Sequence, residues 1–298
     1  MILLTGDNGF LGRHIKEEFN KNTHTFHTLN RTAADYKLDL SSTIPEFKVK
    51  YDTIIHCAGA AHKVPNTKTD SDIIYNTNVK STENLILALD LIGLPKKFVF
   101  ISSVSVYGRS SGNLISENDE LLATDAYGKS KIICEKIIID WCNRNNIIYT
   151  ILRLPLLVGE KPPGNLGDMI NAIKNNYYFN IRNIAPRKSM VLAKDVASIV
   201  LKASEVGGIY NLTDGFHPSL LDLSNCISSQ MKKRKVLTLP FYFVKLLAKL
   251  GDTLMPFLPI DTKKLNKLSS NLTFDDTNAK NAFNWDPQNV LEGFKLKT

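Results

Sequence analysis

The sequence predicts an α/β fold, with a doubly wound parallel sheet in the N-terminal half and a smaller mixed α/β cap after it. Short apolar runs typical of buried parallel strands alternate with helical stretches as far as Pro155. A glycine-rich loop directly follows the first run, at residues 6–12. Beyond Pro155 the alternation weakens into a Pro/Gly-rich loop. We therefore expect one domain over residues 1–160, completed by a strand from about 185–212, and a second over 161–298.

The first strand, Ile2–Thr5, runs into a loop with the spacing G-x-x-G-x-x-G, and an amphipathic helix follows to about Phe19. Glycines here let the backbone turn tightly, let a pyrophosphate approach the helix N-terminus and let helix and strand pack closely. The place of the pattern between a strand and a helix makes it more specific than three glycines alone. The loop residues expected to bind a dinucleotide are Gly6, Gly9, Phe10, Leu11 and Gly12.

The second strand, residues 25–29, is followed by Asn30 and Arg31. Many dinucleotide-binding folds place an acidic residue there, on the adenosine ribose. Without a carboxylate, and with a guanidinium nearby, a 2′-phosphate is acceptable, so we expect NAD or NADP with a slight preference for NADP. The alternative is that Arg31 is simply a solvated loop residue. A third short segment ends at Asp39 and Leu40, which we place at the adenine edge.

A fourth strand begins at Thr53 and runs into the small residues Cys57, Ala58 and Gly59. Small side chains at the C-terminal end of a strand leave room for a cofactor to lie across the sheet. A long helical pattern follows over about residues 72–91 and carries Asn78.

The strand over residues 98–103 delivers the hydroxyl of Ser103 to its C-terminal end, the edge of an open α/β sheet where ligands bind. Tyr127 and Lys131 follow, four residues apart at the start of a helix, so their side chains share one face. A cation beside a phenol, whose ordinary pKa is ~10, favours the phenolate and brings the group closer to neutrality. An ordinary surface pair is the alternative, but the preceding segments favour a catalytic one.

After the next strand, residues 147–154, the elements are shorter. A strand is expected at 208–212, and helices are expected at 166–174, 218–231, 240–254, 261–270, 275–283 and 290–295.

Composition narrows the classes of function. The 298 residues carry 37 basic and 29 acidic side chains, a net charge of +8, which fits an anionic small-molecule substrate. The basic run at 232–235 has no interleaved aromatic residue, so we expect a solvated surface there and no nucleic-acid site. Four cysteines without Cys-x-x-Cys pairs or metal-ligand spacing indicate reduced thiols, a cytoplasmic protein and no metal centre.

The apolar stretch Leu239–Leu258 is interrupted by Lys245, Lys249, Asp252 and Pro256, so it does not span a bilayer. We expect an amphipathic helix packed on the domain and no stable membrane insertion. A helix that lies on a membrane surface is the alternative.

Together these segments resemble the extended short-chain dehydrogenase/reductase family, in particular its nucleotide-sugar epimerase/dehydratase branch. They occur in the family's order and spacing over almost the whole chain. The resemblance implies a Rossmann-like fold with a C-terminal cap that binds substrate. The segments that carry it are Thr5-Gly6-x-x-Gly9-x-x-Gly12, Asp39-Leu40, His56-x-Ala58-Gly59, Asn78-Val79-x-x-Thr82-x-Asn84-Leu85, Ser102-Ser103-x-x-Val106-Tyr107-Gly108 and Tyr127-x-x-x-Lys131.

The resemblance also implies roles. Tyr127 would protonate the C4 oxygen of a sugar as hydride arrives, and Ser103 would polarise the same carbonyl. Lys131 would hold the nicotinamide ribose, and Pro155 would help form the nicotinamide pocket. Further cofactor contacts fall at Asn78 and Ile101, and further substrate contacts fall at Ser105, Asn165, Leu166 and Arg187, the last neutralising a pyrophosphate.

The C-terminal third is similar to a narrower group, the reductases of UDP-4-keto-6-deoxy-N-acetylhexosamines that serve bacterial surface polysaccharide. Residues 162–167, 187–189 and 275–285 carry this similarity. It predicts reduction of the C4 carbonyl of a UDP-linked sugar. A 4-epimerase of UDP-hexose or UDP-N-acetylhexosamine stays open as the main alternative, and a catalytically silent dinucleotide sensor as a third. Family members often pair through two long helices, here near 72–91 and 125–145, so a homodimer is also expected.

Two departures from the family pattern bear on the reaction. Family dehydratases carry an Asp-Glu pair directly after the position of Ser103, where this chain has Val104 and Ser105. A 4,6-dehydratase is therefore not expected. Many epimerases that retain NAD carry an acidic residue at the position of Asn30. Its absence favours an exchangeable cofactor, as a reductase needs.

Overall fold

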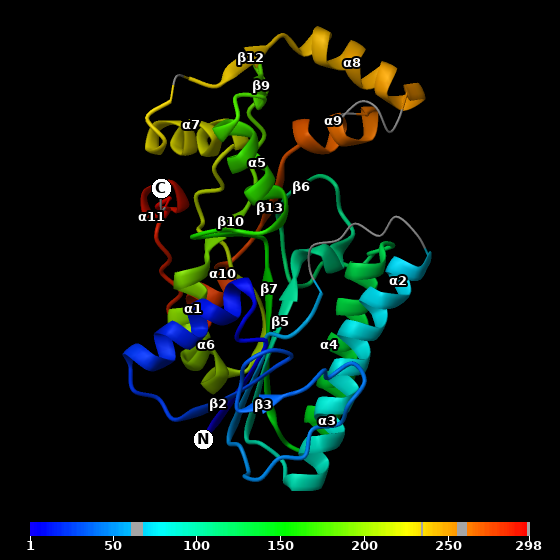
Figure 1. Cartoon of the computed structure of the whole chain (residues 1–298), viewed down its shortest axis with the longest axis vertical. Coiled ribbons are helices and arrows are strands. Elements are labelled where there is room, and N and C mark those ends of the chain that lie inside the picture. Colours follow the sequence, from blue (N-terminus) through cyan, green and yellow to red (C-terminus); the bar gives the residue numbers. More distant parts are fainter. Residues whose placement is uncertain (61–67, 234, 255–260, 297–298) are drawn as a thin grey trace.

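A seven-stranded sheet, with every neighbouring pair of strands parallel, forms the centre of the molecule (Figure 1). The computed structural model describes residues 1–60, 68–233, 235–254 and 261–296. Its strand order, β11-β7-β5-β4-β1-β2-β3, reverses direction beside β1, which is where a doubly wound sheet opens a ligand crevice. The predicted α/β fold is thus confirmed. The strands are β1 (Ile2–Thr5), β2 (Phe26–Asn30), β3 (Tyr36–Lys37), β4 (Thr53–His56), β5 (Lys97–Ser103), β7 (Ile148–Leu154) and β11 (Gly208–Asn211).

Helices cover both faces of this sheet, which is why its central strands are apolar without alternation. Leu4 and Ile55 face one core, closed by α1 (Phe10–Lys21), α6 (Ala193–Val206) and α10 (Thr277–Phe283). Leu3 and Ile54 face the opposite core, closed by α3 (Ser81–Ile92) and α4 (Ala126–Arg144). The two cores hold the strand ends, and therefore the site residues, in a fixed arrangement.

The long helix expected before β5 is divided into three parts. It consists of α2 (Lys68–Tyr75), a π-helical turn (Asn76–Lys80) and α3. Asn78 lies in the π-helical turn, where its carbonyl accepts hydrogen bonds from Thr82 Oγ1 at 2.9 Å and Cys134 Sγ at 3.4 Å. Such turns interrupt the regular helical ladder and are frequent at functional sites.

Short parallel strand pairs, separate from the central sheet, build the cap: β8 (Leu156–Val158) with β10 (Met190–Leu192), β9 (Phe179–Ile181) with β12 (Leu237–Leu239), and β6 (Gly112–Ile115) with β13 (Leu272–Phe274). The sequence predicts none of these strands, because runs of three or four residues carry almost no periodicity. The helix α6, although 14 residues long, is also not among the predicted helices. The cap helices lie close to their expected positions: α5 (Gly164–Lys174), α7 (Leu220–Gln230), α8 (Phe241–Leu254), α9 (Thr262–Ser269) and α11 (Val290–Gly293).

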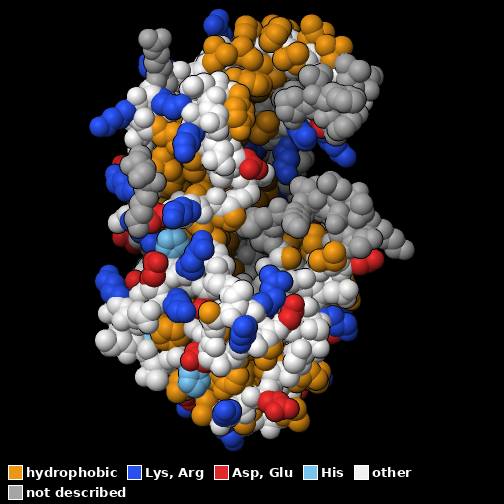
Figure 2. Space-filling view, viewed as in Figure 1, with side chains coloured by type: hydrophobic (Ala, Val, Ile, Leu, Met, Phe, Trp, Pro, Cys, Tyr) orange, Lys and Arg blue, Asp and Glu red, His pale blue; other side chains and the backbone are white. Residues whose placement is uncertain are grey.

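The surface shows no concentration of positive charge on the face seen in Figure 2, where lysine and arginine side chains are spread among acidic and uncharged ones. Within the described ranges, no helix is long and apolar enough to cross a membrane. The residues 255–258 of the apolar stretch lie outside the part that the structure describes.

Candidate active site

A crevice of about 340 Å³ opens beside β1, where the strand order reverses. It brings together nine of the residues expected to bind a dinucleotide: Gly6, Gly9, Asn30, Arg31, Asp39, Leu40, Cys57, Ala58 and Gly59. Five further residues line the crevice that the sequence did not predict: Asn8, Leu29, Leu38, Thr77 and Ser81. The side chains of two further expected residues contribute to the core: Leu11 is buried in it, and Phe10 packs against His14 with ring centroids 5.4 Å apart. Their contact with a dinucleotide stays a prediction.

The glycine loop leaves no space for side chains at two positions. Gly6 has φ +73°, and a Cβ there would lie 2.7 Å from the Ala58 backbone. A Cβ on Gly12 would lie 2.1 Å from the Gly6 carbonyl oxygen. The loop thus packs against the end of β4 and against its own helix, as a phosphate-binding turn at a helix N-terminus requires.

Asn78 connects the end of β4 to α4. Its Oδ1 accepts from the Ala60 N–H at 2.7 Å, and its Nδ2 donates to Ser130 Oγ at 2.8 Å. Ser130 Oγ in turn donates to the Tyr127 carbonyl at 2.7 Å. Asn78, which the resemblance assigns to the cofactor, therefore also helps to position α4, the helix that carries Tyr127 and Lys131.

Ser103, Tyr127 and Lys131 meet at the C-terminal end of β5. Tyr127 lies close enough to Ser103 for the serine hydroxyl to affect its pKa, and Ser103 Oγ donates to Ser105 Oγ at 3.2 Å. The Lys131 ammonium donates to the Ile101 carbonyl at 2.8 Å and lies 6.0 Å from the centroid of the Tyr127 ring. The start of α4 is fixed by Asp125, whose carboxylate accepts from the Gly128 N–H at 3.0 Å.

Burial is the largest influence on the pKa values of Tyr127 and Lys131. It raises the pKa of Tyr127 to about 12, against the opposing effect of the Ser103 hydrogen bond, and it lowers the pKa of Lys131. The expected shift of the phenol pKa toward neutrality is thus not what this arrangement produces, because the desolvation penalty on the phenolate exceeds the effect of the neighbouring groups. At neutral pH the phenol carries its proton.

The comparisons with known proteins agree with this geometry. The model of the NAD dependent epimerase/dehydratase family matches residues 2–213. The chain belongs to this family. The chain is 23% identical to a UDP-glucose 4-epimerase from Vibrio cholerae, over 99% of this chain and 93% of that protein. It is 25% identical to N-acetyl-alpha-D-glucosaminyl-diphospho-ditrans,octacis-undecaprenol 4-epimerase from Escherichia coli O157:H7, over 72% and 67%. The solved structure of MoeE5 with UDP-glucose and NAD superposes with TM-score 0.78 at 19% identity, over 98% of this chain and 95% of that one.

In this epimerase/dehydratase family member, Asn30 organises the loop after β2. Its Nδ2 donates to Asp7 Oδ1 at 2.6 Å, and its Oδ1 accepts the backbone N–H groups of Thr32 and Ala33 at 2.7 and 2.9 Å. The side-chain oxygen is therefore already engaged within the loop. Arg31 is exposed on the wall of the same crevice.

A buried ionic network lies behind the catalytic edge, and the sequence analysis did not find it. Arg153 of β7 and Glu135 of α4 are 3% and 2% exposed and form a salt bridge of 2.8 Å. Ser102 Oγ donates to the same carboxylate at 2.5 Å, and Arg153 also donates to the Tyr107 hydroxyl at 3.0 Å. The only signal in the sequence is the charged Arg153 inside the otherwise apolar end of β7. The network joins β5, α4 and β7 directly beneath Ser103.

The residues expected to bind substrate are dispersed. Ser105 lies beside Ser103, but Asn165 is exposed in the first turn of α5 and the Leu166 side chain is buried in the cap core. Arg187 is exposed and donates to the Phe216 carbonyl at 3.1 Å. Pro155 directly follows β7.

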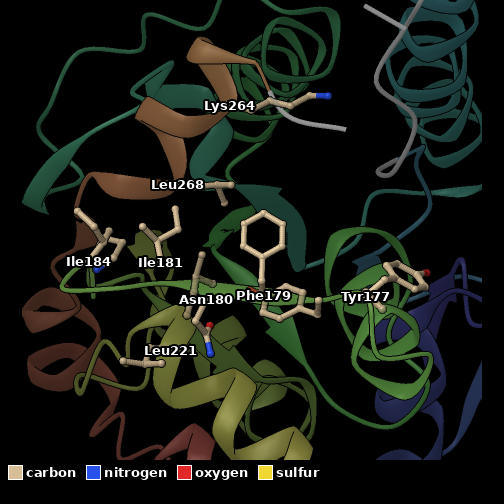
Figure 3. A pocket seen from close by; sticks show the side chains of 12 residues that line it. Tyr177, Phe179, Asn180, Ile181, Ile184, Leu221, Lys264 and Leu268 are labelled. Carbon is tan, nitrogen blue, oxygen red and sulfur yellow. The ribbon is translucent and has the colours of Figure 1, made fainter. Parts of the chain in front are cut away.

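The cap contains its own cavity, of about 300 Å³, between β9, α7 and α9 (Figure 3). Asn180 is 6% exposed at its wall; its Oδ1 accepts from Ser224 Oγ at 3.0 Å, but its Nδ2 has no hydrogen-bond partner among the described residues. A buried donor without a partner requires an explanation. The lining is otherwise largely apolar and includes Tyr177, Phe179, Ile181, Ile184, Leu221 and Leu268.

No group of three His, Cys, Asp or Glu side chains in the described ranges is placed to hold a metal ion.

Proposed function

We propose that this chain transfers hydride between a nicotinamide and C4 of a nucleotide-linked hexose, and that it acts as a 4-keto reductase. The proposed substrate is a UDP-4-keto-6-deoxy-N-acetylhexosamine, used for surface polysaccharide. The observation that carries the proposal is geometric: the phenol of Tyr127 and the ammonium of Lys131, 6.0 Å from the centroid of the Tyr127 ring, lie on α4 at the end of β5, where Ser103 supplies a hydroxyl. A protonated phenol is the form that donates to a carbonyl oxygen while hydride adds to its carbon.

The crevice fits a dinucleotide, because Gly6 and Gly12, where a Cβ would collide with the backbone, allow the tight turn at a helix N-terminus on which the pyrophosphate would lie. A bound NADH or NADPH would supply the hydride. Tyr127 would give its proton to the C4 oxygen, Ser103 would donate a hydrogen bond to the same oxygen, and Lys131 would hold a ribose hydroxyl. The sugar gains one hydride and one proton, and the cofactor is released in its oxidised form.

For the cofactor we propose that both nicotinamide dinucleotides bind, with a slight preference for NADPH. The wall of the crevice offers the exposed Arg31 and an Asn30 oxygen that the loop already uses. Arg31→Ala should raise the KM for NADPH several-fold and leave the KM for NADH nearly unchanged. Equal effects on the two cofactors would contradict the assignment of Arg31.

A 4-epimerase is the second candidate, and the names of the relatives support it. The V. cholerae relative is named for UDP-glucose, and the E. coli relative for an undecaprenyl-diphosphate sugar. We do not propose a dehydratase, because Val104 and Ser105 follow Ser103 and neither provides an acid/base pair. The Ser105 hydroxyl is moreover hydrogen-bonded to Ser103.

One pair of incubations separates the candidates. With a UDP-4-keto-6-deoxy-N-acetylhexosamine and NADPH or NADH, a reductase consumes one cofactor for each 4-hydroxy sugar formed. With UDP-N-acetylglucosamine and no added reductant, an epimerase forms UDP-N-acetylgalactosamine without net cofactor use. Tyr127→Phe should lower kcat of the active pair by about 10²–10⁴ with cofactor affinity nearly unchanged. If the chain bound a cofactor but converted neither sugar, both enzymatic candidates would be excluded and the catalytically silent dinucleotide sensor would remain.

For the cap we propose that its cavity takes the nucleobase, whose carbonyl oxygen would accept from Asn180 Nδ2. The predicted contacts of Asn165, Leu166 and Arg187 with the nucleotide and pyrophosphate belong to the same proposal, with Leu166 limited to its backbone because its side chain is buried. Asn180→Asp keeps the shape and removes the donor, so it should raise the KM for the sugar nucleotide about tenfold. An unchanged KM would exclude the cavity as the nucleobase site.

We also propose a homodimer through α3 and α4. Leu87 and Leu91 of α3 are 47% and 83% exposed and lie on the same helix face. Leu91→Arg should convert the dimer to a monomer in light scattering, and a wild-type monomer would refute the proposal.

A further inference from the structure

α8 lies at the outer end of the cap, on the side away from the central sheet (Figure 1). One face of it is packed as the sequence predicts for an amphipathic helix. Val244 and Ala248 are fully buried and share a cluster with Leu265 of α9. The contact with α9 therefore covers the one apolar face that an amphipathic helix normally has. The opposite face should then be polar.

The opposite face is apolar as well. Tyr242, Phe243 and Leu246 are 84%, 50% and 57% exposed, and Leu250 is 45% exposed one turn beyond Leu246. At 3.6 residues per turn these four side chains fall within an arc of roughly 100°. Figure 2 shows the result as a continuous group of hydrophobic side chains over the end of the cap. Contiguous exposed apolar surface of this kind marks an interaction site.

The charges beside this face have one sign. Lys245 and Lys249 are exposed one turn apart along one edge of the arc, and neither forms a salt bridge with a described residue. The one acidic side chain of α8, Asp252, accepts hydrogen bonds from the Thr262 backbone N–H at 2.9 Å and hydroxyl at 2.5 Å. Long lysine side chains at the edge of an apolar stripe can extend their ammonium groups to the phosphate level of a bilayer.

We propose that α8 is an interfacial helix that docks the cap reversibly on an anionic phospholipid surface. Tyr242, Phe243 and Leu246 would enter the boundary between headgroups and acyl chains, and Lys245 and Lys249 would contact lipid phosphates. A second copy of this chain fits less well, because a two-fold contact between these faces would bring the lysine pairs of both copies together. Docking requires neither cofactor nor sugar and is therefore independent of the proposed reaction.

The test is sedimentation of the full chain with vesicles of equimolar phosphatidylcholine and phosphatidylglycerol, and with pure phosphatidylcholine. The wild type should bind the anionic vesicles, lose most of that binding at high salt, and bind the neutral vesicles weakly. The triple variant Tyr242→Ser/Phe243→Ser/Leu246→Ser should bind anionic vesicles at least tenfold more weakly. Lys245→Gln/Lys249→Gln should reduce binding to the anionic vesicles toward the level of the neutral ones.

Matched controls change the same residue types elsewhere. Ile44→Ser/Val206→Ser removes exposed apolar side chains of the nucleotide-binding part, and Lys21→Gln/Lys202→Gln removes two exposed lysines of α1 and α6. Both controls should bind vesicles like the wild type, and circular dichroism checks that every variant is folded. Equal losses in the controls would overturn the proposal, as would absence of vesicle binding. A dimer that only the triple variant abolishes, without vesicle binding, would instead assign the face to a second copy.

Discussion

His56 should make the fold sensitive to acid. Its side chain is fully buried at the end of β4, where Nδ1 lies 2.8 Å from Thr5 Oγ1 and Nε2 lies 3.1 Å from Thr82 Oγ1. Burial, with a smaller effect of the Lys131 charge, lowers the pKa of this imidazole to about 3. The neutral ring therefore joins β1, the strand before the glycine loop, to α3, which directly follows the π-helical turn with Asn78.

The sign and size of the effect follow from the difference between folded and unfolded states. An unfolded histidine titrates near its ordinary pKa of ~6.5, so below that pH the unfolded chain binds a proton that the folded chain resists. The contribution to stability is complete above that pH and is lost as pH falls toward the folded pKa. Between pH 7 and pH 5 the loss is about 2 kcal/mol, since each unit below the unfolded pKa is worth ~1.4 kcal/mol.

Urea unfolding at pH 7, 6 and 5 measures this loss. His56→Gln is the comparison, because its amide offers a donor and an acceptor but does not titrate. The wild type should lose about 2 kcal/mol more unfolding free energy than the variant between pH 7 and pH 5. If the unfolding free energies of the wild type and of His56→Gln changed equally with pH, the conclusion that His56 is buried in its neutral form would be wrong.

Three further predictions concern the site and its support. Gly12→Ala should cost about 1–3 kcal/mol of unfolding free energy and most of the cofactor affinity, because its Cβ would lie 2.1 Å from a carbonyl oxygen; thermal unfolding and cofactor titration check this. Glu135→Gln should cost about 3–5 kcal/mol because it leaves the Arg153 charge buried without its partner, whereas Lys97→Gln, at a more exposed ion pair, should cost under ~1 kcal/mol. Equal losses would contradict the role of burial. Ser103→Ala should keep the fold and lower kcat about 10²–10³-fold; an unchanged kcat would remove Ser103 from the mechanism.

Local patterns in the sequence determined the central sheet and the dinucleotide crevice. The spacing of Gly6, Gly9 and Gly12 and the four-residue interval between Tyr127 and Lys131 are properties of one loop and one helix, so they can be read without knowing what packs nearby. The small residues after β4 predicted their place in the crevice for the same reason, because the C-terminal ends of parallel strands share one edge.

Only the tertiary structure decided the features that depend on several elements at once. The cap strands are too short for periodicity, and the pairing of Glu135 with Arg153 joins a helix to a strand that no spacing rule connects. The sequence placed an ammonium beside Tyr127 and so predicted a lowered phenol pKa, but the packing around the ring raises it to about 12. The two apolar faces of α8 likewise became distinguishable only when α9 covered one of them. Burial is the common reason, because the solvent that a side chain loses depends on the whole fold and not on its neighbours in the chain.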